Sequence, residues 1–295
     1  MSTTPGARLR ALLAAEPIML PGVFNALTAR MAARIGYKAV YLSGGALSAG
    51  WAGLPDVGLL TLTEFVEQAA LLAGATTLPV VSDADTGFGE AINVSRCVRS
   101  FEHAGVAAIH LEDQVLPKRC GHLSGKGLIP AESMAAKIRA AVASRRDPDF
   151  VIIARTDARS VEGFDAAVER AKLYRAAGAD LIFPEALESE QEFARFAEQV
   201  PFPLLANMTE FGRGPLLDFS QLAGLGYRAV LYPLTAFRAA MKAAERTLER
   251  LRDEGTQRAM LDTMQTRAEL YEEIGYADWE AADRSYFDEA PNRSG

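Results

Sequence analysis

The sequence is poor in cysteine and histidine, with two and three of these residues among 295. Two cysteines cannot form a disulfide framework, and no Cys/His spacing resembles that of a zinc site. Basic residues are fewer than acidic ones, so the formal net charge is −7, and no Lys/Arg cluster is longer than a pair. This charge argues against nucleic acid or an anionic membrane as a partner and favours a small molecule.

Long apolar runs are also missing. The longest uncharged stretch covers residues 39–55, but glycines and serines interrupt it, so we do not expect it to span a membrane. Near the start, Arg8 and Arg10 precede the run Ala11–Ala15, which is too short for the core of a signal peptide. We therefore expect a cytoplasmic protein. At 49% hydrophobic residues, the chain can still bury a sizeable core.

Short β-branched runs alternate with longer helical patterns eight times along the chain. Most of these runs are apolar throughout, as expected of parallel strands that are covered on both faces. The predicted strands are Ile18–Phe24, Lys38–Ser43, Pro79–Asp83, Ala107–Glu112, Phe150–Arg155, Asp180–Glu185, Pro203–Asn207 and Arg228–Tyr232. The pattern predicts an α/β fold, a single (β/α)₈ TIM-type barrel over residues 1–255 with an extra C-terminal helical segment over residues 256–295. Two segments, Gly44–Thr61 and Gln114–Pro130, are predicted as loops longer than a barrel needs.

Polar residues follow nearly every predicted strand, and in a barrel these strand ends meet at one mouth, where active sites lie. Asp83 ends the third strand and Asp85 follows it, while Glu112 ends the fourth and Asp113 follows it, so we expect four carboxylates close together. Such crowding is costly unless a cation or protons neutralise it, and oxygen ligands suit Mg²⁺ or Mn²⁺. Capping of a helix by Asp85, or pairing of the acids with Arg or Lys, is the alternative interpretation.

A second candidate cluster is the segment Lys118-Arg119-Cys120-Gly121-His122. Its cationic residues would lower the pKa of the Cys120 thiol, as proton transfer or nucleophilic chemistry requires, although a plain basic surface loop is the alternative. Cys97 has no such neighbours and is predicted to be a buried structural thiol. Of the three histidines, only His122 has a functional context. Arg155 ends an apolar strand, where an acid or a substrate carboxylate is expected to meet it.

The strand ends and loops also carry longer motifs. They read YLSGG at 41–45, DADTGFG at 83–89, HLEDQ at 110–114, KRCGH at 118–122 and NMTEFG at 207–212. These motifs resemble those of the isocitrate lyase/phosphoenolpyruvate mutase superfamily, and the likeness extends from about residue 21 to residue 276. Within the superfamily, the chain is most similar to the lyases that cleave 2-methylisocitrate. The resemblance implies a Mg²⁺-assisted retro-aldol cleavage into pyruvate and succinate, as in the methylcitrate cycle of propionate catabolism.

The resemblance also implies roles for the residues that match its motifs. Asp83 and Asp85 would hold Mg²⁺, or Mn²⁺ in its place, and Asp56 and Glu112 would act through water. Cys120 would protonate the departing carbanion. The candidates for taking up the substrate's hydroxyl proton are Tyr41, Lys118 and Arg119. Substrate would be bound by Ser43, Gly44, Gly45, Gly121, His122, Arg155, Glu185, Asn207, Thr209, Arg238 and Arg267.

Substrate choice and assembly are implied in the same way. Phe183, Leu231 and Pro233 would surround the substrate's methyl group, and the protein would be a homotetramer whose C-terminal segment is exchanged between barrels. The alternatives are an isocitrate lyase, although those enzymes are usually longer, or a lyase or decarboxylase acting on dimethylmalate or oxaloacetate. A non-catalytic barrel that binds a dicarboxylate is a more distant alternative, which the presence of Asp83 and Cys120 disfavours.

Overall fold

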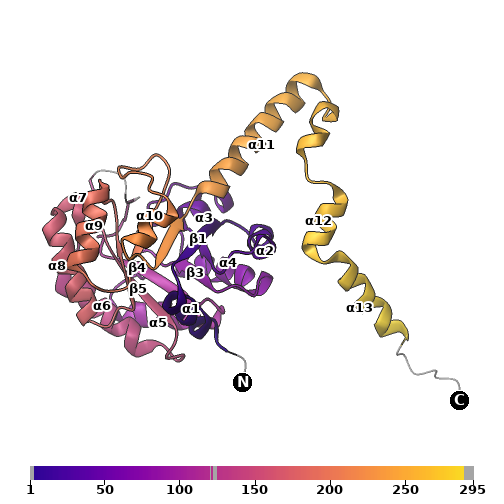
Figure 1. The fold of residues 1–295 in the computed structure, drawn as a ribbon. Coiled ribbons are helices and arrows are strands. Elements are labelled where there is room, and N and C mark those ends of the chain that lie inside the picture. Colours follow the sequence, from indigo (N-terminus) through magenta and orange to yellow (C-terminus); the bar gives the residue numbers. More distant parts are fainter. Residues whose placement is uncertain (1–2, 120, 122–124, 289–295) are drawn as a thin grey trace, which may run out of the picture. The chain divides into compact units, whose positions relative to one another are not determined.

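The computed structural model describes residues 3–119, 121 and 125–288, and within them eight parallel strands form a nearly closed barrel (Figure 1). The strands are β1 (Ile18–Val23), β2 (Val40–Leu42), β3 (Val80–Asp83), β4 (Ala108–Glu112), β5 (Val151–Thr156), β6 (Leu181–Pro184), β7 (Leu205–Asn207) and β8 (Ala229–Tyr232). Their order in the sheet is β6-β5-β4-β3-β2-β1-β8-β7. An isolated bridge between Ile182 and Leu204 brings the two edge strands together. Each strand begins and ends within two residues of its predicted bounds, so the TIM-type barrel is confirmed.

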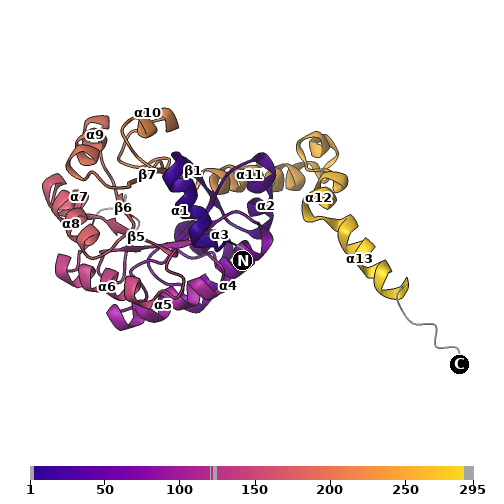
Figure 2. The same cartoon turned by 60° about the horizontal axis from the view of Figure 1, so that its bottom comes forward.

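Helices surround the strands, and Figure 2 shows several of them in sequence around the ring. They are α1 (Pro5–Ala15), α2 (Ala26–Ile35), α3 (Gly44–Trp51), α4 (Leu62–Ala75), α5 (Ala91–His103), α6 (Ala131–Ser144), α7 (Ala158–Val161), α8 (Phe164–Ala176), α9 (Glu190–Gln199) and α10 (Phe219–Gly224). Capping boxes begin several of them, for example at Asn25, Thr61 and Asp218, where a side chain accepts a backbone N–H of the first turn.

The strands read as unbroken apolar runs because each of their faces contacts a different apolar layer. Ile152 of β5 packs between the strands and the surrounding helices, whereas Ile153 belongs to a second cluster that fills the barrel. Both side chains are buried. Leu9 of α1 joins the inner cluster, so this N-terminal helix, which was not predicted, contributes to the barrel's core.

One of the two predicted long loops contains a helix. The prediction of a loop over Gly44–Thr61 is wrong for its first eight residues, which form α3. Ser43 begins this helix by accepting the Ala46 N–H at 3.3 Å, and Leu47 of α3 is buried in the core. The second segment, Gln114–Pro130, has neither helix nor strand in its described residues, although Gln114 forms an isolated bridge with Leu128.

The chain divides into two compact units, residues 1–239 and 240–295. The division falls within α11 (Thr235–Glu254), and the second unit continues with the 3₁₀ helix η1 (Arg258–Thr263), α12 (Arg267–Ile274) and α13 (Tyr276–Asp288). The acidic tail after residue 274 is therefore helical as far as residue 288. Among the described residues, no helix combines the length and apolar character that crossing a membrane requires.

Candidate active site

The carboxyl ends of the strands surround a small cavity of about 60 Å³. Residues from strands β2, β3, β5, β6, β7 and β8 and from the segments after β2, β4, β6, β7 and β8 contribute to its wall. The lining residues are Tyr41, Ser43, Gly45, Asp56, Asp83, Lys118, Arg119, Gly121, Arg155, Phe183, Glu185, Asn207, Thr209, Leu231, Pro233 and Leu234. The structure thus brings most of the predicted site residues to one place, at the end of the barrel where active sites of this fold lie.

Two aspartates at the end of β3 form the acidic side of the site. The Asp83 carboxylate accepts the backbone N–H groups of Gly44 at 3.2 Å and of Asp85 at 2.9 Å. Asp85 has a φ of 45°, a left-handed conformation that is uncommon outside glycine and often found at functional sites. The Lys118 ammonium lies 2.9 Å from Asp85 Oδ1 and is also paired with Asp56. Pairing of these acids with a lysine, the alternative interpretation, is therefore present.

These acids remain in excess over Lys118. Burial raises the pKa of Asp85 to about 7, and the charge of Asp83 adds to this effect, whereas Lys118 opposes it. Burial also raises the pKa of Glu112 above its ordinary range, and Glu112 Oε1 has no hydrogen-bond partner among the described residues. A further positive charge would therefore be stabilised at this site.

The donor set fits a hard divalent cation held by few protein ligands. In the described part of the chain, no three His, Cys, Asp or Glu side chains converge as a ready-made metal cage. Mg²⁺ does not require one, since it keeps several waters and is usually bound through one or two carboxylates. Asp83 and Asp85 supply such a pair of oxygen donors.

Asp113 lies elsewhere, so the prediction of four clustered carboxylates is wrong for this residue. Its side chain accepts the hydroxyl groups of Thr156 and Tyr174, both at 2.8 Å, and pairs with Arg170 at 3.2 Å. Successive side chains along a strand point to opposite faces, so Glu112 faces the barrel interior while Asp113 faces the helices.

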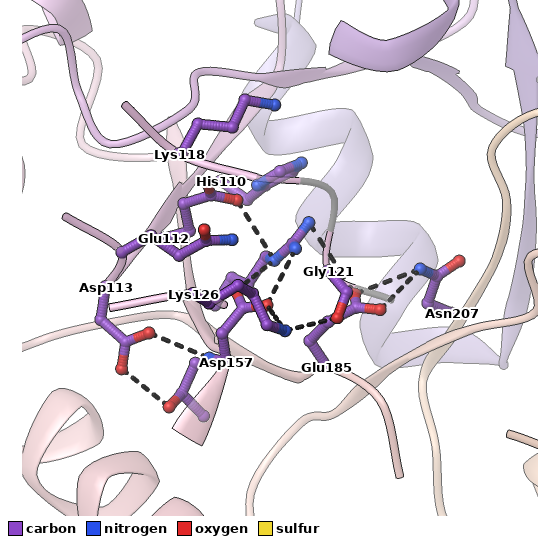
Figure 3. A network of polar contacts seen from close by, with 12 residues as sticks. His110, Glu112, Asp113, Lys118, Gly121, Lys126, Asp157, Glu185 and Asn207 are labelled. Carbon is purple, nitrogen blue, oxygen red and sulfur yellow. Dashed lines mark hydrogen bonds and ion pairs between the residues drawn. The ribbon is translucent and has the colours of Figure 1, made fainter. Parts of the chain in front are cut away.

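Arg155, at the end of β5, is surrounded by acids, as its place after an apolar run predicts. Its Nε lies 2.9 Å from Asp157 and 3.3 Å from Glu112, and its Nη1 lies 3.8 Å from Glu185. Glu185 in turn accepts hydrogen bonds from Asn207 Nδ2 at 3.1 and 3.3 Å (Figure 3). The cation and the amide are thus fixed beside the cavity, where they can bind a carboxylate or hydroxyl of a ligand.

His110 is a site residue that the sequence analysis missed. Its Nε2 forms a 2.7 Å hydrogen bond with the Tyr41 hydroxyl and lies 3.5 Å from Asp83 Oδ1. Burial lowers the pKa of His110 to about 4, so the ring is neutral at pH 7. Burial, together with the Asp83 charge, raises the pKa of Tyr41, so its phenol keeps its proton. The position of His110 inside a strand gave no functional signal, although it opens the HLEDQ motif.

Two glycines of the site lie where no side chain fits. A Cβ on Gly44 would be 2.7 Å from Asp83 Oδ2, and a Cβ on Gly121 would be 2.5 Å from Arg155 Nη2 and 2.6 Å from Glu185 Cγ. Such distances are shorter than real Cβ contacts, so these backbone segments approach the functional side chains as only glycine allows. Four apolar residues, Phe183, Leu231, Pro233 and Leu234, also line the cavity.

Residues 9–252 match the model of the phosphoenolpyruvate phosphomutase family. The chain belongs to this family. It is 53% identical to the 2-methylisocitrate lyase of Aeropyrum pernix over 95% of this chain and 90% of that protein. It is 49% identical to the 2-methylisocitrate lyase of Escherichia coli over 94% of each.

Solved structures of the phosphoenolpyruvate phosphomutase family and its superfamily have the same fold. Oxaloacetate acetylhydrolase in complex with the inhibitor 3,3-difluorooxalacetate superposes with a TM-score of 0.91 at 36% identity, covering 96% of this chain and 97% of that one. Phosphonopyruvate hydrolase in complex with oxalate and Mg²⁺ superposes with a TM-score of 0.88 at 32% identity, covering 96% and 99%.

Three predicted residues, Gly44, Asp85 and Glu112, do not line the cavity themselves, but each contacts a residue that does. Four others are not placed at the cavity. Arg238 of α11 is 44% exposed at its side chain, lies 3.7 Å from Glu210, and does not line the cavity among the described residues. Arg267 begins α12 in the second unit. Cys120 and His122 lie outside the described residues. The functional roles that the phosphoenolpyruvate phosphomutase superfamily implies for these four residues stay predictions.

Cys97 is buried, as predicted for a structural thiol. Burial raises the pKa of this thiol, so it does not ionise near pH 7. It lies in α5, packed in the apolar layer between helices and strands.

Proposed function

We propose that this chain is a carbon–carbon lyase that cleaves 2-methylisocitrate to pyruvate and succinate in the methylcitrate cycle. One observation carries the proposal: acids suited to a divalent cation, a cation and an amide suited to substrate carboxylates, and an apolar patch line one cavity. This combination of groups is suited to a methylated tricarboxylate. The chain is also 53% and 49% identical in sequence to two proteins named 2-methylisocitrate lyase.

In this proposal Asp83 and Asp85 hold Mg²⁺, or Mn²⁺ in its place, while Asp56 and Glu112 act through water. When bound, the ion supplies Lewis-acid polarisation of the substrate's oxygens. The raised pKa of Asp85, caused first by burial and further by the charge of Asp83, and the unpartnered oxygen of Glu112 support a cation here, because a bound cation would favour the ionised carboxylates.

Substrate carboxylates and hydroxyls are bound by groups around the rim. Arg155 supplies a buried guanidinium, and the backbone of Ser43, Gly44 and Gly45 lies at the N-terminus of α3, which favours anions. The remaining proposed contacts come from Gly121, His122, Glu185, Asn207, Thr209, Arg238 and Arg267.

The reaction requires two proton transfers. The substrate's hydroxyl proton passes to a base, the carbon–carbon bond breaks, and its electron pair stays on the carbon that becomes part of succinate. The thiol of Cys120 then donates a proton to that carbon. Tyr41, Lys118 and Arg119 are the candidates for the first transfer, and all three line the cavity. Because the pKa values of Tyr41 and Lys118 are raised, either group must first release its own proton to solvent before it can accept the one from the substrate.

The apolar side of the cavity sets the preference for the methylated acid. Phe183, Leu231 and Pro233 can surround a methyl group, whereas isocitrate would leave a void there. Filling such a space is worth about 1–3 kcal/mol.

The proposed enzyme is a cytoplasmic homotetramer in which the barrel of residues 1–255 exchanges the segment 256–295 with a neighbour. Large apolar side chains of α13 support this exchange, because Trp279, Tyr286 and Phe287 are 75%, 73% and 75% exposed in the single chain. Light scattering of the full chain would measure the mass of the assembly, and a monomer would contradict this part.

Purified protein with Mg²⁺ tests the activity when it is incubated separately with 2-methylisocitrate, isocitrate, dimethylmalate and oxaloacetate. We expect pyruvate and succinate, in equal amounts, from the first acid and slower or no cleavage of the others. Preferential release of acetate and oxalate from oxaloacetate would instead indicate an oxaloacetate acetylhydrolase, the activity named for one of the similar solved structures.

A further inference from the structure

Asp157, the residue after β5, determines how the Arg155 guanidinium is oriented. It is fully buried, and its two carboxylate oxygens accept hydrogen bonds from Arg155 Nε at 2.9 Å and from Arg155 Nη2 at 3.2 Å. A contact through two nitrogens fixes the plane of the guanidinium. Glu112 and Glu185, at 3.3 and 3.8 Å, each face a single nitrogen and fix it less.

Lys126 connects Asp157 to the loop after β4. Its side chain is 1% exposed, and its Nζ lies 2.7 Å from Asp157 Oδ1 and also donates to the carbonyl of Gly121 (Figure 3). Burial opposes the charge of Asp157, but Arg155 and Lys126 outweigh burial and lower the pKa of Asp157 to about 2. The carboxylate therefore stays ionised at pH 7 and pairs with both cations at once.

Asp157 is itself anchored to the outer layer of the barrel. Its backbone N–H donates to Asp113 Oδ1 at 2.9 Å, and the other oxygen of Asp113 accepts the Thr156 and Tyr174 hydroxyls. Tyr174 belongs to α8, so Asp157 is fixed by the scaffold rather than by the loop.

Gly121 and Arg155 lie so close together that no side chain fits between them. A Cβ on Gly121 would overlap Arg155 Nη2 and the Glu185 side chain. In the sequence Gly121 directly follows Cys120, the proposed acid. A group that holds the Gly121 carbonyl therefore restrains the residue that follows the proposed acid in the sequence.

From these contacts we infer that Lys126 and Asp157 are positioning residues, which hold the Gly121 peptide and the Arg155 guanidinium in one fixed relation beside the cavity. Neither has to touch substrate. This inference rests on the proposed function in so far as it takes Gly121 and Arg155 as substrate-binding groups. Positional errors of about 1 Å around reacting groups cost on the order of a hundredfold in rate, so the pair is expected to affect turnover strongly.

Steady-state kinetics of K126M, K126R and the control K172M test the inference. Lys172 also pairs with an acid, Glu169 at 2.8 Å, but its side chain is 50% exposed on the outer surface. We expect K126M to lower kcat by between about ten- and a hundredfold, with a smaller change in KM. K126R should recover at least about a third of that loss on a logarithmic scale. The kcat of K172M should stay within about twofold of the wild type. A kcat of K126M within about threefold of the wild type, or an effect on KM alone, would overturn the inference.

Hydrogen exchange separates this inference from the proposed function, because it needs no turnover. In the absence of substrate, amides of the peptide that contains Gly121 should exchange faster in K126M than in the wild type and in K172M, while unfolding temperatures stay close. Should K126M fail to fold, K126Q, which lacks the charge but keeps a donor, takes its place. If the wild type cleaves none of the four acids, the proposed function fails while the exchange data still decide the positioning role. Unchanged exchange at Gly121 would refute that role.

Discussion

Gly121→Ala should remove most of the enzyme's turnover while it leaves the barrel folded. The added methyl would lie 2.5 Å from Arg155 Nη2. Ordinary van der Waals contact begins at 3.4 Å, so the methyl would be 0.9 Å too close. Arg155 cannot easily give way, because it is buried and held by Asp157 at 2.9 Å. Glu185, the other close neighbour, is held by hydrogen bonds from Asn207.

The loop backbone at residue 121 is therefore expected to move by roughly 1 Å. A displacement of this size beside reacting groups lowers the rate by about a hundredfold, which corresponds to about 2.7 kcal/mol of transition-state stabilisation. The barrel itself should be little affected, because Gly121 lies in a loop and belongs to neither apolar cluster of the core.

Pyruvate release from 2-methylisocitrate measures the effect, with Gly224→Ala as the matched control. Gly224 ends α10, and a Cβ there would meet no atom within 4 Å. The control should keep wild-type kinetics, and both variants should unfold near the wild-type temperature. A kcat/KM of Gly121→Ala within about threefold of the wild type would refute the reasoning, as would an equal loss in the control.

Three further predictions follow from the same site. Cys120→Ser should fold normally but lose nearly all turnover, since a serine hydroxyl is a far weaker acid, whereas Cys97→Ser should keep most of it; equal effects in the two variants would be inconsistent with the proposed role. Chelation of divalent metal should abolish activity, and calorimetry should show weaker Mg²⁺ binding by Asp83→Asn and Asp85→Asn; full activity in excess chelator would contradict the metal assignment. Asp157 has its pKa lowered from 3.8 to about 2 in the folded state, so it stabilises the fold above about pH 4, and about 2 kcal/mol of that stability is lost as the pH falls toward 2. Urea unfolding between pH 5 and 2 should therefore depend less on pH in Asp157→Asn, and an unchanged slope would contradict this prediction.

The barrel could be predicted because its strands are buried on both faces. Ile152 and Ile153 point into different apolar layers, so residues 151–154 of β5 appear in the sequence as an uninterrupted apolar run. Apolar runs of this kind alternate with helical patterns along the chain, and few folds other than an α/β fold with a parallel sheet are compatible with that alternation.

Helix α3 could not be predicted from local preference. Its sequence, GGALSAGW, is rich in glycine and serine, which are poor helix formers. It forms because Ser43 caps its first turn and because Ala46 and Leu47 are buried against the core. Tertiary packing, which a single sequence does not display, outweighs propensity there.

The site was predictable where strand ends determine position and not where distant contacts do. Asp83 and Arg155 lie at the carboxyl ends of β3 and β5, so their places in the mouth could be deduced. Asp113 directly follows β4 and faces the helices because side chains alternate between the two faces of the sheet. An error of one residue in the predicted alternation would turn it to the opposite face. Lys126 meets Asp157 across 31 positions of sequence, and nothing local to either residue indicates that pairing.

The preference for the methylated acid tests the central claim most directly. Equal concentrations of 2-methylisocitrate and isocitrate are mixed with the protein and Mg²⁺, and pyruvate and glyoxylate are measured in the same tube. Because Phe183, Leu231 and Pro233 line an apolar side of the cavity, we predict a pyruvate excess of roughly ten- to a hundredfold. An excess of glyoxylate would contradict the proposed substrate and leave only membership of the family.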